Sequence, residues 1–261
     1  MSRRRGMGTV LAIAAVALAI AGARHTLDTP GQHNAPGSSG AAPAAPHTGG
    51  AALPAQAPGP ISARAARAAL TRLPVLAARP HRPGYQRGCK ARQACSFGPA
   101  WTDNSTAPGA GNSCDTRNDV LHAQMTHVVL RAGSGCIVES GRLADPYTGK
   151  TINFTRGSTT SARVQVDHAV PLALAYDLGA WAWTPQQRTA YANDEALVLV
   201  AVDGPANEKK SDAGPADWMP VKSDWCAYDA RFVAVLSHYR LAITAADKSA
   251  ITNVLTHCPG A

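Results

Sequence analysis

Apolar and polar residues follow a two-residue period in several short stretches of the second half of the chain. Residues 137–143 and 151–154 have this period, and the Asp-Pro-Tyr-Thr-Gly segment between them is favoured turn chemistry, so together they predict a β-hairpin. Residues 163–166 predict a third short strand, which ends at Asp167-His168. The continuous apolar run 196–202 predicts a fourth strand.

Other stretches have the three- and four-residue period of amphipathic helices. This period predicts two helices at the end of the chain, over 224–239 and 245–257. The second is preceded by a Thr244…Asp247 capping pattern. The apolar stripes of these two helices are predicted to belong to the hydrophobic core.

Local start and stop signals predict further helices. The stretch "TPQQRTAYA" has Thr184 as N-cap and Pro185 at the first helical position, and "LALAYDLGA" stops at Gly179. The stretch "CDTRNDVLHAQMTHVVL", residues 114–130, is predicted to be one capped helix. A short helix rich in Ala and Arg is predicted over 61–73, and another short polar helix within "DGPANEKKSD".

The composition divides the chain into four parts. Residues 1–23 have three arginines, an apolar run and a small-residue end, which is the layout of a cleaved secretory signal peptide. The apolar run is short beside the roughly 20 residues of a membrane span, so no stable membrane insertion is expected after cleavage; an uncleaved anchor is the alternative. Residues 24–60 predict a disordered Ala/Pro/Gly-rich linker. A basic arm and loop over 61–113 and a packed domain over 114–261 are expected to follow.

The six cysteines are expected to form disulfides. Their number is even, and an exported chain reaches an oxidising compartment, where disulfides are favoured over free thiols or zinc. No Cys-x-x-Cys pair occurs, which weakens a zinc hypothesis further. Sequence alone does not fix the connectivity. Pairing of neighbours predicts the bonds Cys89–Cys95, Cys114–Cys136 and Cys226–Cys258.

The net charge of +8 is unevenly distributed along the chain. Residues 1–109 contain 12 Lys and Arg against 2 Asp and Glu, whereas residues 110–261 contain 13 against 15. The basic residues after the linker could neutralise nucleic-acid phosphates, or they could form a solvated surface. The candidate nucleic-acid-binding residues are Arg64, Arg67, Arg72 and Arg163.

The candidate catalytic centre is Asp167-His168, at the end of a predicted strand. A later strand is followed by "N-x-x-K-x-D", which includes Asn207 and Lys210. A carboxylate and an amide oxygen can hold Mg²⁺, which prefers oxygen ligands and keeps several waters. An imidazole with a pKa of about 6.5 suits removal of a proton from the attacking water, and the metal together with Lys210 would offset charge on the phosphate. The alternative is structural: Asp167 could cap a helix, and His168 could be a satisfied surface histidine.

The combination "VDHAVPL…AND…LVAVDGPANEKKSD…DWMP" resembles the HNH nucleases of the ββα-metal (His-Me finger) superfamily. Within it, the chain is similar to exported bacterial HNH proteins related to the C-terminal domain of GmrSD-type restriction endonucleases. The resemblance continues in "LTRLPV", "FGPAW", "CDTRNDVL" and "DPYTGK" and covers about residues 69–258. It implies an α+β fold, in which a small antiparallel sheet with the ββα-metal motif is flanked by helices and stapled by disulfides.

The resemblance also implies roles for individual residues. Asp167 matches the metal-binding acid, His168 the general base, and Asn207 the Asn that opens the last helix of the motif. Lys210 matches a basic position that follows and is expected to act in catalysis. Asn193 is a further candidate metal ligand, although "AND" is also favoured turn chemistry.

Two functions remain open at this point. The first is a secreted bacterial endonuclease that hydrolyses DNA with a His-activated water and one divalent cation, Mg²⁺ by preference, with Mn²⁺ or another ion possible. The second is a catalytically weak or inactive exported module that keeps the HNH fold and binds nucleic acid or an envelope polymer. Val198 favours the second, because relatives often have Asn at this position, whereas the intact Asp167-His168 pair favours the first. Serine and zinc hydrolases are disfavoured, because Gly-x-Ser-x-Gly and His-Glu-x-x-His are missing. The oligomeric state is not predicted.

Overall fold

A computed structural model describes residues 61–259, which lie within one compact unit of the chain. The predicted signal peptide and linker fall on residues 1–60 and so lie outside the described residues. No helix within 61–259 combines the length and apolar character needed to cross a membrane.

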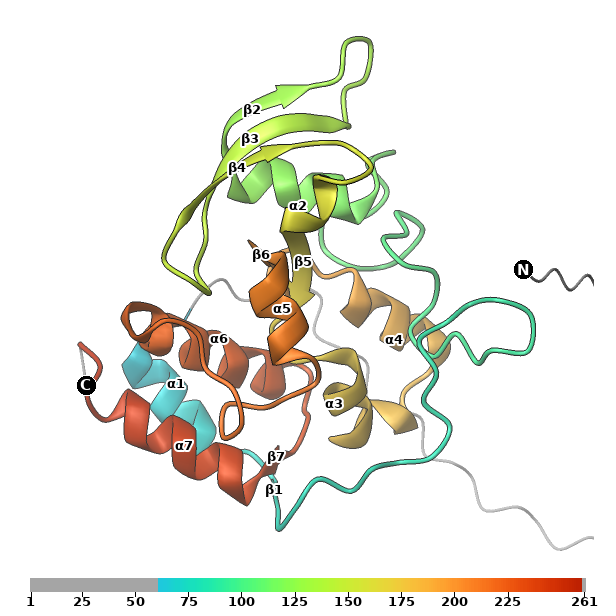
Figure 1. Ribbon diagram of the computed structural model, residues 1–261. Helices are drawn as coiled ribbons and strands as arrows, with labels where there is room; N and C mark the ends of the chain where they lie inside the picture. Colours follow the sequence, from blue (N-terminus) through green and yellow to red (C-terminus); the bar gives the residue numbers. More distant parts are fainter. Residues whose placement is uncertain (1–60, 260–261) are drawn as a thin grey trace, which may run out of the picture. The chain divides into compact units, whose positions relative to one another are not determined.

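The strands form three small sheets (Figure 1). β2 (Thr126–Leu130), β3 (Val138–Ala144) and β4 (Thr151–Thr155) form an antiparallel sheet in that order, so the predicted hairpin is present as β3 and β4. β5 (Val164–His168) pairs antiparallel with β6 (Leu199–Asp203). The two-residue strands β1 (Val75–Leu76) and β7 (Ile243–Thr244) pair in parallel.

The β5–β6 pair leads directly into helix α5 (Gly204–Lys210). Asp203, the last residue of β6, accepts a hydrogen bond from the backbone N–H of Ala206 and thereby caps the helix. A Cβ atom at Gly204 would clash with the carbonyl oxygen of Ala162, which precedes β5. Glycine therefore lets the start of α5 lie close to the chain that enters β5, and Figure 1 shows α5 beside the two strands.

The remaining helices enclose the core. The predicted helices are present as α3 (Leu172–Asp177), α4 (Pro185–Ala192), α6 (Trp225–His238) and α7 (Ala245–Leu255), and α4 begins with the expected Thr184 cap in a full capping box. Short 3₁₀ turns are η1 (Ser161–Arg163), η2 (Ala180–Ala182) and η3 (Lys222–Asp224).

Helix α1 (Ala63–Leu70) packs against α6 and α7, as Figure 1 also shows. Its residues Ala66 and Leu70 are buried in the same hydrophobic cluster as the later helices. The segment 61–113, expected as an arm outside the packed domain, thus contributes to the domain's own core. The physical reason is that alanines three and four residues apart give this Arg-rich helix one apolar face.

The prediction of a single helix over 114–130 is wrong for the second half of this segment. α2 (Thr116–Gln124) ends before Met125, whose backbone is extended, and the chain continues as strand β2. The run Thr-His-Val-Val is rich in β-branched residues, which favour strands, and pairing with β3 supplies the hydrogen bonds that a longer helix would have made. His127 has a left-handed backbone (φ 53°) at an irregularity of this pairing, which no helical period could indicate.

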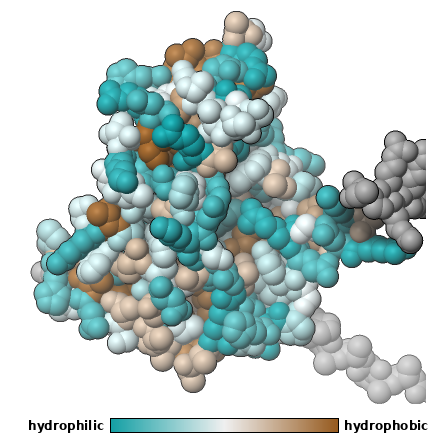
Figure 2. Space-filling model, in the orientation of Figure 1, coloured by the Kyte–Doolittle hydropathy of each residue, from teal (hydrophilic) through white to brown (hydrophobic). Residues whose placement is uncertain are grey.

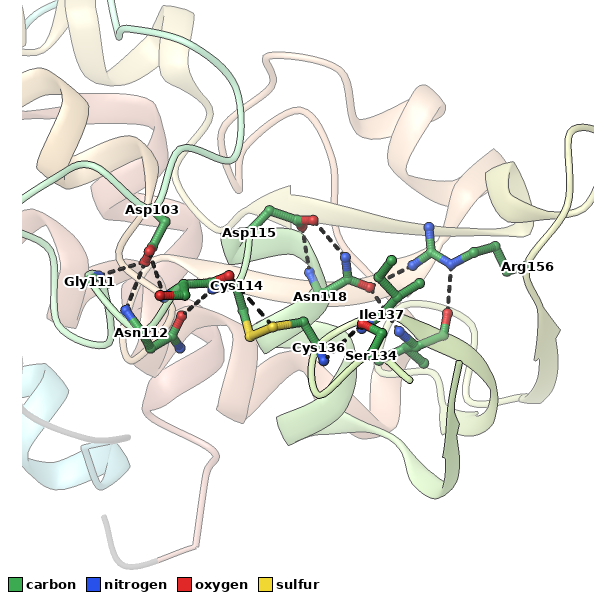
Figure 3. The surroundings of a disulfide bond; sticks show 12 residues. Asp103, Gly111, Asn112, Cys114, Asp115, Asn118, Ser134, Cys136, Ile137 and Arg156 are labelled. Carbon is green, nitrogen blue, oxygen red and sulfur yellow. Dashed lines mark hydrogen bonds between the residues drawn. A yellow bond between two sulfur atoms is a disulfide. The ribbon is translucent and has the colours of Figure 1, made fainter. Parts of the chain in front are cut away.

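All three predicted disulfides are present, and no cysteine within 61–259 is free. Cys114–Cys136 joins the start of α2 to the chain just before β3 (Figure 3). Beside it, the side-chain oxygen of Asn118 accepts hydrogen bonds from the backbone N–H of Val138 and from the Arg156 guanidinium. The disulfide and this buried amide together fix α2 against the three-stranded sheet.

Figure 2 shows a face of the molecule on which hydrophilic side chains surround small, separate hydrophobic areas. Among residues 61–259, the large hydrophobic side chains that are exposed are Val75, Val129, Trp181 and Val221. They belong to four different segments of the chain, and single exposed apolar side chains are normal for a globular domain.

Candidate active site

A cavity of about 540 Å³ lies at the end of β5 and beside α5. Asp167 and His168 from β5 line it together with Asn207 from α5, so the fold brings three of the predicted site residues to one cavity. We call it the Asp167 cavity. The antiparallel pairing with β6 fixes the strand end, because Asp167 pairs with Val200 and His168 with Leu199.

The two oxygens of the Asp167 carboxylate have different surroundings. Oδ2 accepts a hydrogen bond from the Tyr147 hydroxyl at 2.5 Å and one from Lys210 Nζ at 2.7 Å. Oδ1 has no hydrogen-bond partner within residues 61–259, although the side chain is only 8% exposed and lines the cavity. Two donors therefore fix the carboxylate through one oxygen and leave the other available to a ligand.

The His168 ring is held by one backbone contact. Its Nε2 lies 3.0 Å from the carbonyl oxygen of Ala192, and because a carbonyl only accepts, Nε2 must be the protonated nitrogen. Nδ1 then has a free lone pair and no partner within the described chain. Burial lowers the pKa of His168 to about 3, with nearby Arg87 adding to the effect, so the imidazole is neutral at physiological pH.

The aromatic ring of Trp101 lies against this imidazole. The two ring centroids are 6.0 Å apart and the planes differ by 16°, which is a stacked arrangement, and Tyr191 stacks on His168 at 6.5 Å. Together with the Ala192 contact, these rings restrict the imidazole to one orientation.

The side chain of Asn207 forms part of the cavity wall, and a neighbouring side chain orients its amide. Its Nδ2 donates to Gln165 Oε1 at 2.8 Å, which orients the amide and leaves its Oδ1 unused. Gln165 in turn donates to Glu208 at 3.1 Å. Asp212 also lines the cavity, but Arg79 pairs with its carboxylate at 2.9 Å. Oδ1 of Asp167 and Oδ1 of Asn207 thus have no hydrogen-bond partner inside the described chain, and both residues line the cavity.

Lys210 was expected to offset charge on a bound phosphate, which requires that its side chain reach the cavity, but the structure places it in the protein interior. Its side chain is fully buried, and Nζ donates to Asp167 Oδ2 and to the carbonyl oxygen of His168 at 3.0 Å. It does not line the Asp167 cavity. Burial lowers the pKa of Lys210, and the Asp167 carboxylate opposes this shift. In this position Lys210 holds Asp167 and the end of β5 instead of facing a phosphate.

Asn193 and Val198 lie away from the cavity wall. Asn193 caps the end of α4, where its Nδ2 donates to the carbonyl oxygen of Thr189, and its Oδ1 is buried without a partner inside the described region. Val198 is completely buried, and its carbonyl accepts a hydrogen bond from Ala169 N. Neither lines the Asp167 cavity.

The four arginines predicted to bind nucleic acid lie elsewhere on the surface. Arg64, Arg72 and Arg163 are exposed, whereas Arg67 is half-buried and donates to the carbonyl oxygen of Leu255 at 2.7 Å. None of them lines the Asp167 cavity.

Sequence reasoning gave no role to several residues of the cavity. Arg87 and Arg117 supply its positive charge, and Trp101 stacks on His168. Tyr147 does not line the cavity, but it holds Asp167 from behind it through a hydrogen bond. Burial and the nearby Arg156 lower the pKa of Arg117, whose guanidinium donates to the carbonyl oxygen of Val164 at 2.9 Å. The signals in the sequence are that Trp101 and Tyr147 belong to "FGPAW" and "DPYTGK", two stretches of the family resemblance, and that Arg87 belongs to the basic segment after the linker.

The fold thus places an Asp-His pair at the end of β5 and an Asn on α5, the short helix that follows β6. The sequence profile described as "GmrSD restriction endonucleases, C-terminal domain" matches residues 115–254, more than half of the chain. The chain therefore belongs to this family, which is of the HNH endonuclease type.

A secreted relative is also known. A protein of Arthroderma benhamiae described as an "Uncharacterized secreted protein" is 36% identical over 211 residues, which is 79% of this chain and 93% of the relative. No solved structure matches the chain. The expected HNH family is confirmed, whereas the expected bacterial origin is not, because this relative is fungal.

Proposed function

We propose that the protein is a secreted, metal-dependent HNH endonuclease that hydrolyses phosphodiester bonds of nucleic acid, with DNA as the expected substrate. The observation that supports this most directly is the Asp167 cavity, which is lined by a fixed carboxylate, a neutral imidazole and an oriented amide. Membership of the family of GmrSD C-terminal domains agrees with this chemistry. The secreted relative and the three disulfides agree with export.

The free oxygens of the cavity fit a hard divalent cation. Asp167 Oδ1 and Asn207 Oδ1 are oxygen donors of the kind that Mg²⁺ and Mn²⁺ prefer. No group of three His, Cys, Asp or Glu residues suited to a metal occurs within 61–259, and a two-ligand site with water and phosphate does not require one. When bound, such a cation would offset negative charge on the phosphate. Asn193, buried at the end of α4, is not part of this proposed ligand set.

His168 is the proposed general base. Its Nε2 proton is engaged by Ala192, so only Nδ1 can take a proton from a water molecule in the cavity. Burial lowers the pKa of His168 to about 3, so the imidazole is neutral at physiological pH and its Nδ1 has a lone pair that can accept a proton.

Lys210 and Tyr147 are proposed as positioning residues. Both donate to Oδ2 of Asp167, from α5 and from the turn between β3 and β4 respectively. Because both donors occupy the same oxygen, the carboxylate presents Oδ1 in a fixed direction. This role replaces the direct contact of Lys210 with phosphate that the sequence suggested.

Plasmid cleavage by the purified, disulfide-intact protein tests the proposal. We expect cleavage with Mg²⁺ or Mn²⁺, none with EDTA, and a loss of about 10²- to 10⁴-fold in rate for His168→Ala, the range typical of general acid–base catalysis. The matched control is His122→Ala, since His122 is exposed on α2 and does not line the cavity. Cleavage that persists in His168→Ala, or a folded wild-type protein that leaves DNA and RNA intact with every metal, would contradict the proposal. In the second case a binding module without catalysis, the alternative considered above, would be favoured.

A further inference from the structure

A second hollow adjoins the Asp167 cavity on the side of Trp101. It has a volume of about 300 Å³, and four residues line both spaces: Arg87, Trp101, His168 and Leu172. Because the two spaces share these residues, they lie next to each other, and His168, the proposed general base, borders both. We call this second space the Trp101 hollow.

The walls of the Trp101 hollow are mostly apolar and aromatic. Phe97, Pro99 and Ala192 line it together with Trp101 and Leu172. Arg87 is exposed and adds a positive charge on the side shared with the Asp167 cavity. An apolar space of this volume with one convergent charge is typical of a small-ligand site.

The loop that forms these walls is fixed by the Cys89–Cys95 disulfide. Within the loop, the backbone of Gln86 and Ser96 is joined by an N–H to O hydrogen bond of 2.9 Å, and that of Cys95 and Gly88 by one of 3.0 Å. Cys89 itself lines the hollow. The bonded loop therefore holds Arg87 in place without a helix or strand.

Trp101 has an unusual backbone conformation for a bulky residue. Its φ is 58°, in the left-handed region, and its carbonyl accepts a hydrogen bond from Thr116 N at the start of α2. Observed outliers of this kind concentrate at functional sites, where the surrounding structure enforces them. Here the conformation sets the indole beside His168 and between the two spaces.

We infer that the Trp101 hollow binds one unpaired nucleobase of the substrate strand, while Arg87 contacts a neighbouring phosphate. The inference rests on the proposed nuclease function and narrows its substrate. The flat indole and the apolar wall match the face of a base, which every base offers without regard to sequence. The guanidinium of Arg87 matches the negative phosphate beside it.

The geometry selects for a single-stranded segment of the substrate. In a duplex both faces of a base are covered by its neighbours, so protein side chains reach only the base edges and the backbone. A base enters a lined hollow only when it is unpaired or turned out of the helix, which costs energy in a duplex. Single-stranded nucleic acid therefore binds more tightly than duplex of the same length.

The test measures the affinity of the protein for two labelled oligonucleotides by fluorescence anisotropy. EDTA prevents turnover, and the titrations start at low ionic strength. The probes are a labelled thymidine 10-mer and an abasic 10-mer with the same phosphates. We expect Trp101→Ala to weaken binding of the thymidine 10-mer about 5- to 150-fold, the range for loss of one base–aromatic stack, and to leave the abasic 10-mer unaffected. Arg87→Gln should weaken both probes equally and reduce the salt slope by about one.

Matched variants control for folding and for general charge. Trp101→Phe keeps an aromatic face and should bind like wild type. Trp181→Ala removes an exposed tryptophan outside the hollow, and Arg92→Gln removes an exposed arginine from the same disulfide loop; neither should change binding.

The outcomes separate this inference from the proposed function. The base subsite is overturned, even if plasmid is cleaved, if wild type does not bind the thymidine 10-mer. It is also overturned if Trp101→Ala binds the thymidine 10-mer as tightly as wild type does, or if this variant loses affinity for both 10-mers by the same factor. If the base-dependent loss is observed and plasmid remains intact with every metal, the subsite stands and the catalytic proposal fails.

Discussion

Replacement of Lys210 by methionine tests how the structure uses this residue. Met has a similar length and no charge, so Lys210→Met removes the two hydrogen bonds of Nζ with little loss of packing. The carboxylate of Asp167, a residue that is 6% exposed, would keep Tyr147 as its remaining partner. An isolated buried charge of this kind destabilises a protein strongly.

The magnitude follows from the burial of the pair. Loss of one partner from a buried ion pair costs about 3–5 kcal/mol of unfolding free energy. Because Asp167 lines the cavity, we expect the lower end, about 3 kcal/mol, which for a domain of this size lowers Tm by about 6–12 °C. The double variant Asp167→Asn/Lys210→Met removes both charges and should be more stable than Lys210→Met.

Urea denaturation of the oxidised proteins measures these differences, and an oligonucleotide titration adds a second readout. If Lys210 does not touch phosphate, the salt slope of binding by Lys210→Met equals that of wild type. A stability within 1 kcal/mol of wild type, together with a salt slope reduced by about one, would refute this reasoning and restore the phosphate contact suggested by the sequence.

Two further predictions concern buried positions. Burial and the nearby Asp247 raise the pKa of Asp229 from 3.8 to about 7, and its two oxygens have no partner within the described chain. Protonation of Asp229 therefore contributes up to about 4 kcal/mol to the unfolding free energy, a contribution that is complete below pH ~4 and lost as pH rises through 7. Asp229→Asn should remove this loss when urea unfolding at pH 5 is compared with pH 8.5. An unchanged pH dependence in Asp229→Asn would contradict the prediction. Val198→Asn introduces the amide that the family resemblance implies at this position, but Val198 is completely buried and away from the cavity, so we expect a loss of about 1–3 kcal/mol in unfolding free energy and no gain in metal-dependent cleavage. A more active and equally stable Val198→Asn would show that this position reaches the metal.

Local chemistry determined a large part of the fold. The Thr184 cap and Pro185 act within a few residues of each other, so the start of α4 is evident from the sequence. The apolar periods of α6 and α7 are local in the same sense, and the cysteine pairs are close enough in sequence that pairing of neighbours is correct. The end of α2 was misjudged because strand pairing with β3, a contact between separate segments, overrides the helical pattern of 125–130.

The candidate site divides in the same way. The sequence by itself determined the chemical groups of the Asp-His pair and their place at the end of a strand, because the two residues are adjacent and the apolar alternation before them is local. Tertiary structure alone decided that Lys210 is buried against Asp167, 43 residues away, and that Tyr147 shares the same oxygen. It also decided that Arg87 and Trp101, from an irregular loop, stand beside His168. The reason is physical: burial, charge pairing and stacking depend on distances between segments, and a one-dimensional pattern contains no such distances.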